Sequence, residues 1–196
     1  MRFLAVLLGL LVLAPAASAA PGEVTIRRGP EGTPHIRAQS FEGIGYGFAY
    51  AHAQDNLCVL ADAYVTVSGE RSRFFGPNAT YPIRNTVTTP NNLNSDFFWA
   101  RVAKDRVVEK LIAQAAPAGP EDEVREVMRG YVQGYNAYLR ESGDKVSDPA
   151  CKGQPWVRPI TEIDAYRRVY FLGVLASQNA APVSYTHLTL PTKRIV

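Results

Sequence analysis

The chain has 196 residues, of which 46% are hydrophobic, 20% charged and 10% aromatic. This is the composition of an ordinary globular protein, and it excludes the disordered, collagen-like and coiled-coil classes. The formal net charge is +3, but Arg2, Lys193 and Arg194 lie in the two terminal segments and the body without them is neutral, so the charge favours neither a nucleic-acid partner nor binding to an anionic membrane.

The first residues predict an export signal. Arg2 gives a short basic start, residues 3–13 are apolar, and residues 17–19 (ASA) form a small-x-small cleavage signature. The alternative is a membrane anchor, but a spanning helix needs about 20 apolar residues and this run is shorter. We therefore expect residues 1–19 to be a signal peptide and the mature protein to be periplasmic or secreted.

A β-hairpin and a long helix are expected next. Residues 24–28 alternate apolar and polar side chains, residues 29–34 are rich in Gly and Pro, and residues 35–38 are extended again. Ser40 can then cap a helix. Its apolar positions fit a helical period only loosely; they are Ile44, Phe48, Ala51, Leu57, Leu60, Tyr64 and Val67. Its many Gly and Ala residues permit close backbone packing, so tertiary contacts should be needed to hold it.

Two further helices are predicted in the middle of the chain. A polar loop over residues 69–94 precedes a helix that should begin at Asn94 or Ser95. Its apolar residues are Phe98, Val102, Val108, Leu111 and Ile112. Pro120 suits the first position of the next helix, and Gly143 suits its end. That helix carries an apolar stripe made of Val124, Val127, Tyr131, Tyr135 and Tyr138.

A last helix and an unusual tail complete the sequence. Thr161 with Asp164 forms a capping-box pattern for a helix that should run to about Gln178. Residues 183–196 resemble translated sequencing-adapter sequence, so we expect them to be non-native; a genuine strand-like end is the alternative. The expected organisation is one hairpin and four helices, without internal repeats, in a body of residues 20–182.

The sequence contains none of the common catalytic motifs: no GxSxG, HExxH, phosphate-binding loop or CxxC pair. His52 and Asp55 share a helical face, and a structural polar contact between them is favoured over a metal-ligand pair because no third ligand is near. Cys58 and Cys151, an even pair in an exported protein, most simply form one disulfide; two free thiols are the alternative. No catalytic residue and no metal site are assigned to this chain.

Ordered motifs along the chain resemble the penicillin acylase family. They are GTPHIRA (residues 32–38), GYGFAYAHAQDNL (45–57) and GERSRFFG (69–76). Further segments are similar to the aculeacin and acyl-homoserine-lactone acylase branch of that family. These are DNLCVLA (55–61), NSDFF (94–98), GYVQGYN (130–136) and DPAC (148–151) before Trp156. The resemblance covers residues 24 to about 181.

The resemblance implies an N-terminal nucleophile hydrolase with a four-layer αββα fold. An exported precursor is cut into an α chain and a β chain, and the new N-terminal Ser of the β chain attacks the amide with its own α-amino group as the base. This sequence resembles only the signal and the α chain. The expected fold class is therefore α+β: a mostly helical α-chain fragment with a short N-terminal β-hairpin. Its expected partners are the β chain of the same precursor and an N-acyl small-molecule substrate.

The resemblance also implies where this chain meets its substrate. In the family the last helix of this region lines the acyl pocket, and the expected contacts are Leu172, Gly173, Leu175, Ala176 and Ser177. Ordinary helix packing is the alternative role for them. Some members bind calcium, but the matching position falls in residues 183–196, so no cofactor is assigned.

Two functions therefore stand against each other. The first is an acylase precursor that hydrolyses N-acyl amide bonds of acyl-homoserine lactones, lipopeptides or β-lactam side chains, with the present chain inactive on its own. The second is a non-enzymatic exported helical module for binding or scaffolding. The sequence of the gene downstream of residue 181 discriminates them.

Overall fold

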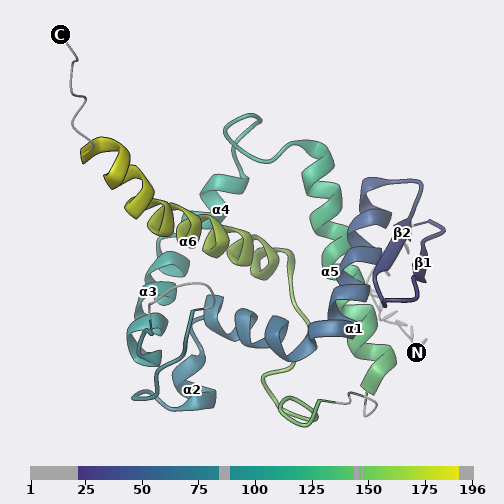
Figure 1. Cartoon of the computed structure of the whole chain (residues 1–196), viewed down its shortest axis with the longest axis horizontal. Helices are drawn as coiled ribbons and strands as arrows, with labels where there is room; N and C mark the ends of the chain where they lie inside the picture. Colours follow the sequence, from purple (N-terminus) through teal and green to yellow (C-terminus); the bar gives the residue numbers. More distant parts are fainter. Residues whose placement is uncertain (1–21, 84–88, 144–145, 147, 190–196) are drawn as a thin grey trace, which may run out of the picture.

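The computed structural model describes residues 22–83, 89–143, 146 and 148–189, with side chains described as far as Ser177 (Figure 1). A two-stranded sheet precedes a series of helices. The elements are β1 (Thr25–Arg28), β2 (Pro34–Arg37), α1 (Phe41–Val67), α2 (Arg71–Phe75), α3 (Asn92–Lys104), α4 (Val107–Ile112), α5 (Asp122–Ser142) and α6 (Glu162–Thr189). The mostly helical α+β class is as the sequence predicts. The predicted export signal, residues 1–19, lies outside the described residues.

The predicted hairpin is confirmed. Strands β1 and β2 are antiparallel, with Ile26 opposite Ile36. Gly32 in the turn has a φ of 80°, a left-handed conformation that favours glycine. The hairpin packs on the outer side of α1, as Figure 1 shows.

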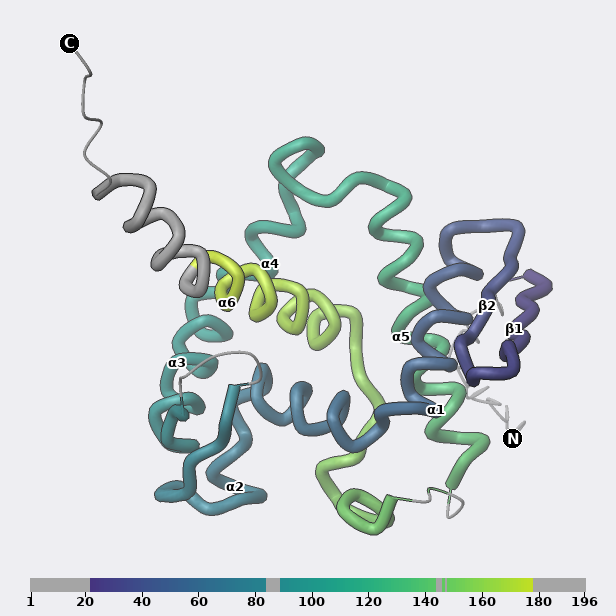
Figure 2. Tube along the Cα trace, viewed as in Figure 1, coloured from purple at the N-terminus to yellow at the C-terminus, as the bar shows by residue number. Residues whose placement is uncertain are grey.

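Helix α1 consists of two segments that meet at a kink. Ser40 caps it as predicted, because its Oγ accepts a hydrogen bond from the Gly43 N–H at 3.0 Å. Asn56 has non-helical φ and ψ of −141° and 35°, and the axis turns there. The tube in Figure 2 shows the first segment lying beside α5 and the second running away from it towards α2.

The first segment of α1 is packed by backbone rather than by side chains. A Cβ added at Gly130 of α5 would lie 1.8 Å from the Glu42 carbonyl oxygen, and one at Gly134 would lie 2.1 Å from the Tyr46 carbonyl oxygen. On the hairpin side, a Cβ at Gly47 would lie 2.5 Å from Ile36 Cγ2. The small residues of this segment therefore form its core-facing surface. Of the apolar residues named for this segment in the sequence, Ala51 is buried, whereas Ile44 and Phe48 are 39% and 49% exposed.

The region after α1 differs from the sequence prediction in three places. The expected polar loop contains the short helix α2. Helix α3 begins at Asn92, earlier than expected, because the Asn91 side chain accepts hydrogen bonds from Leu93 N–H and Asn94 N–H and caps it there. One predicted helix is two, since Arg106 adopts a left-handed φ of 52° between α3 and α4.

The last two helices follow the predicted boundaries at two of their four ends. Helix α5 has Glu121 as its N-cap, so Pro120 precedes the cap instead of occupying the first helical position; Gly143, with a φ of 42°, ends the helix as predicted. The Thr161 capping box is confirmed, since Thr161 N–H donates to Asp164 Oδ2 at 2.9 Å and Asp164 N–H donates to Thr161 Oγ1 at 3.4 Å. Helix α6 continues past Gln178 to Thr189.

The core lies where the second segment of α1 meets α3, α5 and α6. Its largest side chains include Tyr64 and Tyr135, whose rings meet edge to face at 5.3 Å, together with Trp99 and Trp156. Burial raises the pKa of both tyrosines. Among the described residues, no helix has both the length and the hydropathy that a membrane span requires.

Candidate functional site

An open groove runs between the second segment of α1 and helix α6. Its volume is about 310 Å³. One wall comes from α1, the other from α6, and the end is closed by the short stretch of chain before residue 84. The lining residues are Val59, Asp62, Ala63, Thr66, Tyr81, Pro82, Ile83, Arg168, Phe171, Leu172 and Leu175. The groove is therefore mainly apolar, with one acidic and one basic side chain in its walls.

The structure divides the five predicted pocket residues between two parts of the surface of α6. Leu172 and Leu175 line the groove. Gly173, Ala176 and Ser177 are exposed and are not among its lining residues. The Ser177 hydroxyl donates to the Val174 carbonyl oxygen at 2.8 Å, within its own helix. Only the two leucines are thus brought to the groove.

A buried arginine supports the α1 side of the groove. Arg71, at the start of α2, has a side chain only 6% exposed. Its Nη1 donates to Asp62 Oδ1 at 2.8 Å and to Thr66 Oγ1 at 2.9 Å, and its Nε donates to Asn92 Oδ1 at 2.9 Å. Charge-assisted hydrogen bonds of this kind are among the strongest in proteins. Arg71 therefore ties α1, α2 and α3 together beneath the groove.

Tyr81 covers the other side of the same guanidinium. The Arg71 Cζ lies 3.6 Å from the centre of the Tyr81 ring, which is cation–π geometry. The Tyr81 hydroxyl is hydrogen-bonded to Ser95 Oγ at 2.8 Å, and burial raises the Tyr81 pKa. These contacts hold the chain before residue 84 at the closed end of the groove.

The N-terminal end of α6 is fixed by a second arginine. Arg158 Nη2 donates to Ser68 Oγ at 2.8 Å, and its Nη1 lies 3.3 Å from Asp164 Oδ2. Asp164 is buried and also closes the capping box of α6. Because Ser68 caps the C-terminal end of α1, this network sets the spacing of the two groove walls at that end.

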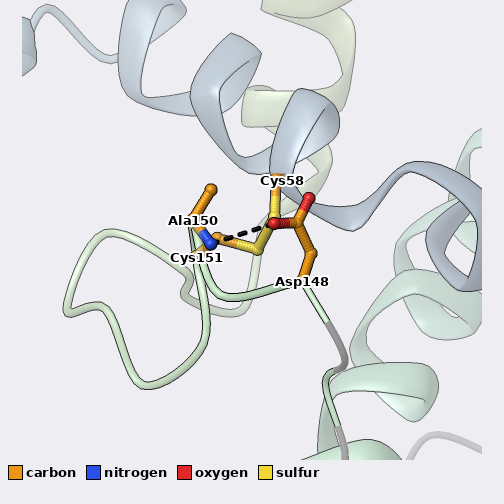
Figure 3. Close-up of a disulfide and its surroundings, with 4 residues drawn as sticks. All are labelled: Cys58, Asp148, Ala150 and Cys151. Carbon is orange, nitrogen blue, oxygen red and sulfur yellow. Dashed lines mark hydrogen bonds between the residues drawn. A yellow bond between two sulfur atoms is a disulfide. The ribbon is translucent and has the colours of Figure 1, made fainter.

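Cys58 and Cys151 are joined by a disulfide, with their Cα atoms 5.4 Å apart (Figure 3). This separation is within the limit of about 7 Å for bridging two cysteines. Cys58 lies just after the kink of α1, and Cys151 lies in the loop between α5 and α6. Asp148 Oδ1 accepts a hydrogen bond from Ala150 N–H at 2.9 Å and shapes that loop. The bond anchors the loop that leads into α6.

The polar contact predicted between His52 and Asp55 was wrong. Asp55 instead forms an ion pair with Arg28 of the hairpin, at 2.9 Å. His52 is half-buried, and its Nδ1 is buried without a hydrogen-bond partner. Burial and the Arg168 charge lower the pKa of His52, so the ring is neutral at pH 7. The described part of the chain holds no group of three or more His, Cys, Asp or Glu side chains that could bind a metal ion.

Sequence reasoning missed two structural features of the groove. Arg168 lies on the α6 wall of the groove. On the α1 side, Asp62 and Tyr81 both contact the Arg71 guanidinium. Arg168 comes three positions before Phe171 and four before Leu172, so it shares a face of the last helix with them. This spacing was a signal available in the sequence. Tyr81 gave no such signal, because it belongs to an irregular segment without periodicity.

The chain matches the family model described as penicillin amidase over residues 23–186. It is 41% identical to aculeacin-A acylase from Actinoplanes utahensis over 170 residues, which are 85% of this chain and 20% of that acylase. It is 45% identical to the acyl-homoserine lactone acylase PvdQ from Pseudomonas fluorescens (strain Pf0-1) over 139 residues, 71% of this chain and 16% of that one. The chain thus spans about a fifth or less of these curated relatives.

A solved structure shares the fold. The chain superimposes on a thermostable penicillin G acylase from Alcaligenes faecalis with a TM-score of 0.59 and 25% sequence identity. The match covers 80% of this chain and 73% of that one.

Proposed function

The chain belongs to the penicillin amidase family, and on this basis we propose that it is the N-terminal part of an exported acylase precursor that hydrolyses N-acyl amide bonds. The observation that carries the proposal is the similarity, at 41% and 45% identity, to two acylases. The proposed substrates are acyl-homoserine lactones, lipopeptides or β-lactam side chains, all of which present an N-acyl amide.

The catalytic nucleophile of the proposed enzyme belongs to a β chain of the same precursor. An N-terminal serine there would attack the amide carbonyl, and its α-amino group suits the role of base because its ordinary pKa is near 8. The present chain supplies no catalytic residue. It would pack on the β chain, and several exposed apolar side chains support such a partner: Phe97, Phe98 and Phe48 are 67%, 45% and 49% exposed.

The contribution of this chain to specificity would be the wall of the acyl pocket. Leu172 and Leu175 line an apolar groove of about 310 Å³, which suits an aliphatic chain. Gly173, Ala176 and Ser177 present small side chains on the neighbouring exposed surface of α6, where a β chain would cover them. We retain all five as proposed substrate contacts.

The proposed compartment is the periplasm or the extracellular space. The disulfide between Cys58 and Cys151 supports it, because such bonds persist in oxidising compartments. The N-terminal sequence pattern supports export as well.

A chimera tests the function. Residues 20–182 replace the matching segment of aculeacin-A acylase, and carboxylic acid release from acyl-homoserine lactones is measured. We expect the chimera to hydrolyse them and the isolated chain to be inactive. A processed, folded chimera without activity would contradict the proposal, as would turnover by the isolated chain. A native stop codon soon after residue 181 in the genomic sequence would favour the scaffold module instead.

A second chimera variant tests the groove. Leu175→Trp fills the groove, so kcat/KM should fall more for a decanoyl than for a butanoyl substrate. Val169→Trp is the matched control, because Val169 is on the same helix, 53% exposed and not a lining residue. Equal losses for both chain lengths in Leu175→Trp would show that the groove does not hold the acyl chain.

A further inference from the structure

Asp62 presents a half-exposed carboxylate to the groove between α1 and α6. Its side chain is 42% exposed and lines the groove. One of its oxygens, Oδ1, accepts the hydrogen bond from Arg71 Nη1 at 2.8 Å. The other oxygen, Oδ2, accepts no hydrogen bond from any described residue. Because each carboxylate oxygen has two lone pairs, Asp62 keeps unused acceptor capacity on the groove.

The position of this carboxylate is fixed from below. The Arg71 side chain is only 6% exposed, and it also donates to Thr66 Oγ1 at 2.9 Å and to Asn92 Oδ1 at 2.9 Å. The Tyr81 ring covers the same guanidinium, 3.6 Å from its Cζ. An acceptor that is already held in place loses little side-chain freedom when a ligand binds. Asp62 is therefore preorganised to accept a hydrogen bond.

The other polar side chains of the described lining are already engaged or face away. The Thr66 hydroxyl donates to the Asp62 carbonyl oxygen at 2.9 Å, and the Tyr81 hydroxyl is hydrogen-bonded to a serine of α3. Arg168 carries no acceptor, and two of its nitrogens, Nε and Nη1, are buried inside the protein. Asp62 Oδ2 is therefore the best acceptor that this lining offers to a ligand.

The charges around the groove favour a neutral donor over a cation. The Asp62 charge is balanced by the ion pair with Arg71, and Arg168 adds a positive charge on the opposite wall. An ammonium group would meet this net positive charge. A hydroxyl group brings no charge and still forms a charge-assisted hydrogen bond with a carboxylate. The apolar side chains of the lining, Leu172 and Leu175 among them, suit the carbon chain that carries it.

We propose that Asp62 determines specificity by selecting acyl chains that carry a hydroxyl group. The hydroxyl donates to Asp62 Oδ2, and the carbon chain lies against Leu172 and Leu175. The inference rests on the proposed function, because the occupant is the acyl chain of the proposed N-acyl substrate. A chain with a keto group at the same carbon is the opposite case, since it places a second acceptor against Oδ2. A site built to bind a hydroxyl rejects an analogue that cannot donate.

A binding measurement on the intact chain tests this without any catalysis. The ligands are esters of methyl octanoate that carry a hydroxyl or a keto group near the ester, at mid-chain or near the methyl end. Affinity is measured by NMR titration of the labelled methyl groups of Leu172 and Leu175. At one of the three positions the hydroxyl ester should bind about ten-fold more tightly than its keto counterpart, which is the effect of one charge-assisted hydrogen bond.

Asp62→Asn is the decisive variant. The amide oxygen can still accept from Arg71, but the atom facing the groove becomes an N–H donor, so the preference should reverse in favour of the keto ester. Asp55→Asn is the matched control: Asp55 is on the same helix, is also 42% exposed and paired with an arginine, and does not line the groove. It should leave the preference unchanged. Should Asp62→Asn fail to fold, the wild-type ratio of hydroxyl to keto affinity decides.

Three results would overturn the proposal. They are no binding of any ester, equal affinity for hydroxyl and keto esters at all three positions, and a hydroxyl preference that persists in Asp62→Asn. Tighter binding of an amino ester than of the hydroxyl ester would replace the neutral donor by a cation and also contradict it. The two proposals fail separately: an inactive chimera leaves the binding preference standing, and an active chimera without the preference contradicts only the role of Asp62.

Discussion

The two segments of α1 on either side of Asn56 are packed in opposite ways. The first is enclosed by the hairpin and α5, and its contacts are between backbones at glycine positions. The second is held by large buried side chains and a buried arginine, and it leaves an open groove against α6. The comparison indicates that close backbone contacts hold the first segment in place, whereas the second segment leaves a groove that another group can occupy.

The largest expected effect comes from a single methyl group added to α5, where that helix packs on the first segment of α1. Gly130→Ala should destabilise the protein by more than about 4 kcal/mol, because the added Cβ would lie 1.8 Å from the Glu42 carbonyl oxygen and both atoms belong to helix backbones. Chemical denaturation followed by circular dichroism measures the free energy of unfolding.

Gly173→Ala is the matched control for that change. It is the same substitution in the helix α6, and an added Cβ there meets nothing within 4 Å. We expect it to stabilise the protein by up to about 1 kcal/mol, since Ala is the better helix former. Equal destabilisation by the two variants would show that backbone contact between α1 and α5 is not what holds the first segment.

The second segment should be sensitive to the loss of its buried arginine. Arg71→Leu removes the donors to Asp62, Thr66 and Asn92 and leaves their oxygens unpaired. Breaking a buried charged network costs about 3–5 kcal/mol. Arg73→Leu, in the same short helix but with a 71% exposed side chain, should change the unfolding free energy by less than about 0.5 kcal/mol. A small effect of Arg71→Leu would mean that the groove wall forms without this network.

The disulfide connects the two differently packed regions, and its loss should have an intermediate effect. Cys58→Ala with Cys151→Ala frees the loop between α5 and α6, which should cost about 2–5 kcal/mol because the bond closes a loop of 93 residues. Urea denaturation with and without dithiothreitol measures it. The wild type should lose stability on reduction and the double variant should not respond; a wild type indifferent to reductant would contradict the prediction.

The parts of the fold that sequence predicted are those governed by local chemistry. The turn before β2, the Ser40 cap, the Gly143 stop and the Thr161 capping box each depend on residues a few positions apart. The parts that it missed depend on distant contacts. The ion pair of Asp55 with Arg28 joins the hairpin to α1, and it outcompetes the local His52 contact that spacing alone favoured.

The candidate site shows the same division. Leu172 and Leu175 could be placed on the groove helix by resemblance, but the groove itself exists only because α1 turns at Asn56, a position with no sequence signal for a kink. The importance of small residues in α1 was predicted, but the exposure of Ile44 and Phe48 was not, because hydrophobic periodicity assumes that large side chains make the contacts.

The smallest expected effect lies at the edge of the enclosed segment. The Tyr50 hydroxyl donates to Glu141 Oε2 at 2.6 Å and so links α1 to the end of α5. This hydrogen bond, burial and the Glu141 charge raise the pKa of Tyr50 to about 12. The folded state holds the proton more tightly than the unfolded state, whose tyrosine pKa is about 10. The stabilisation is therefore fully present below about pH 10 and is lost as the pH rises through 12.

Glu141→Gln isolates that contribution. The substitution removes the carboxylate that accepts the hydrogen bond from the Tyr50 hydroxyl, so the Tyr50 pKa should fall towards about 10. The free energy of unfolding at neutral pH should fall by about 1 kcal/mol or less, because the pair is at the surface. Titration of ¹³C-labelled tyrosine by NMR follows the change, with Tyr50→Phe identifying the resonance. Tyr138 also contacts Tyr50, edge to face at 5.6 Å, and that packing remains in the variant. If the pKa of Tyr50 stayed near 12 in Glu141→Gln, burial and not the hydrogen bond would be the cause of the raised pKa. The enclosed part of α1 would then extend further towards the end of α5 than the hydrogen bond indicates.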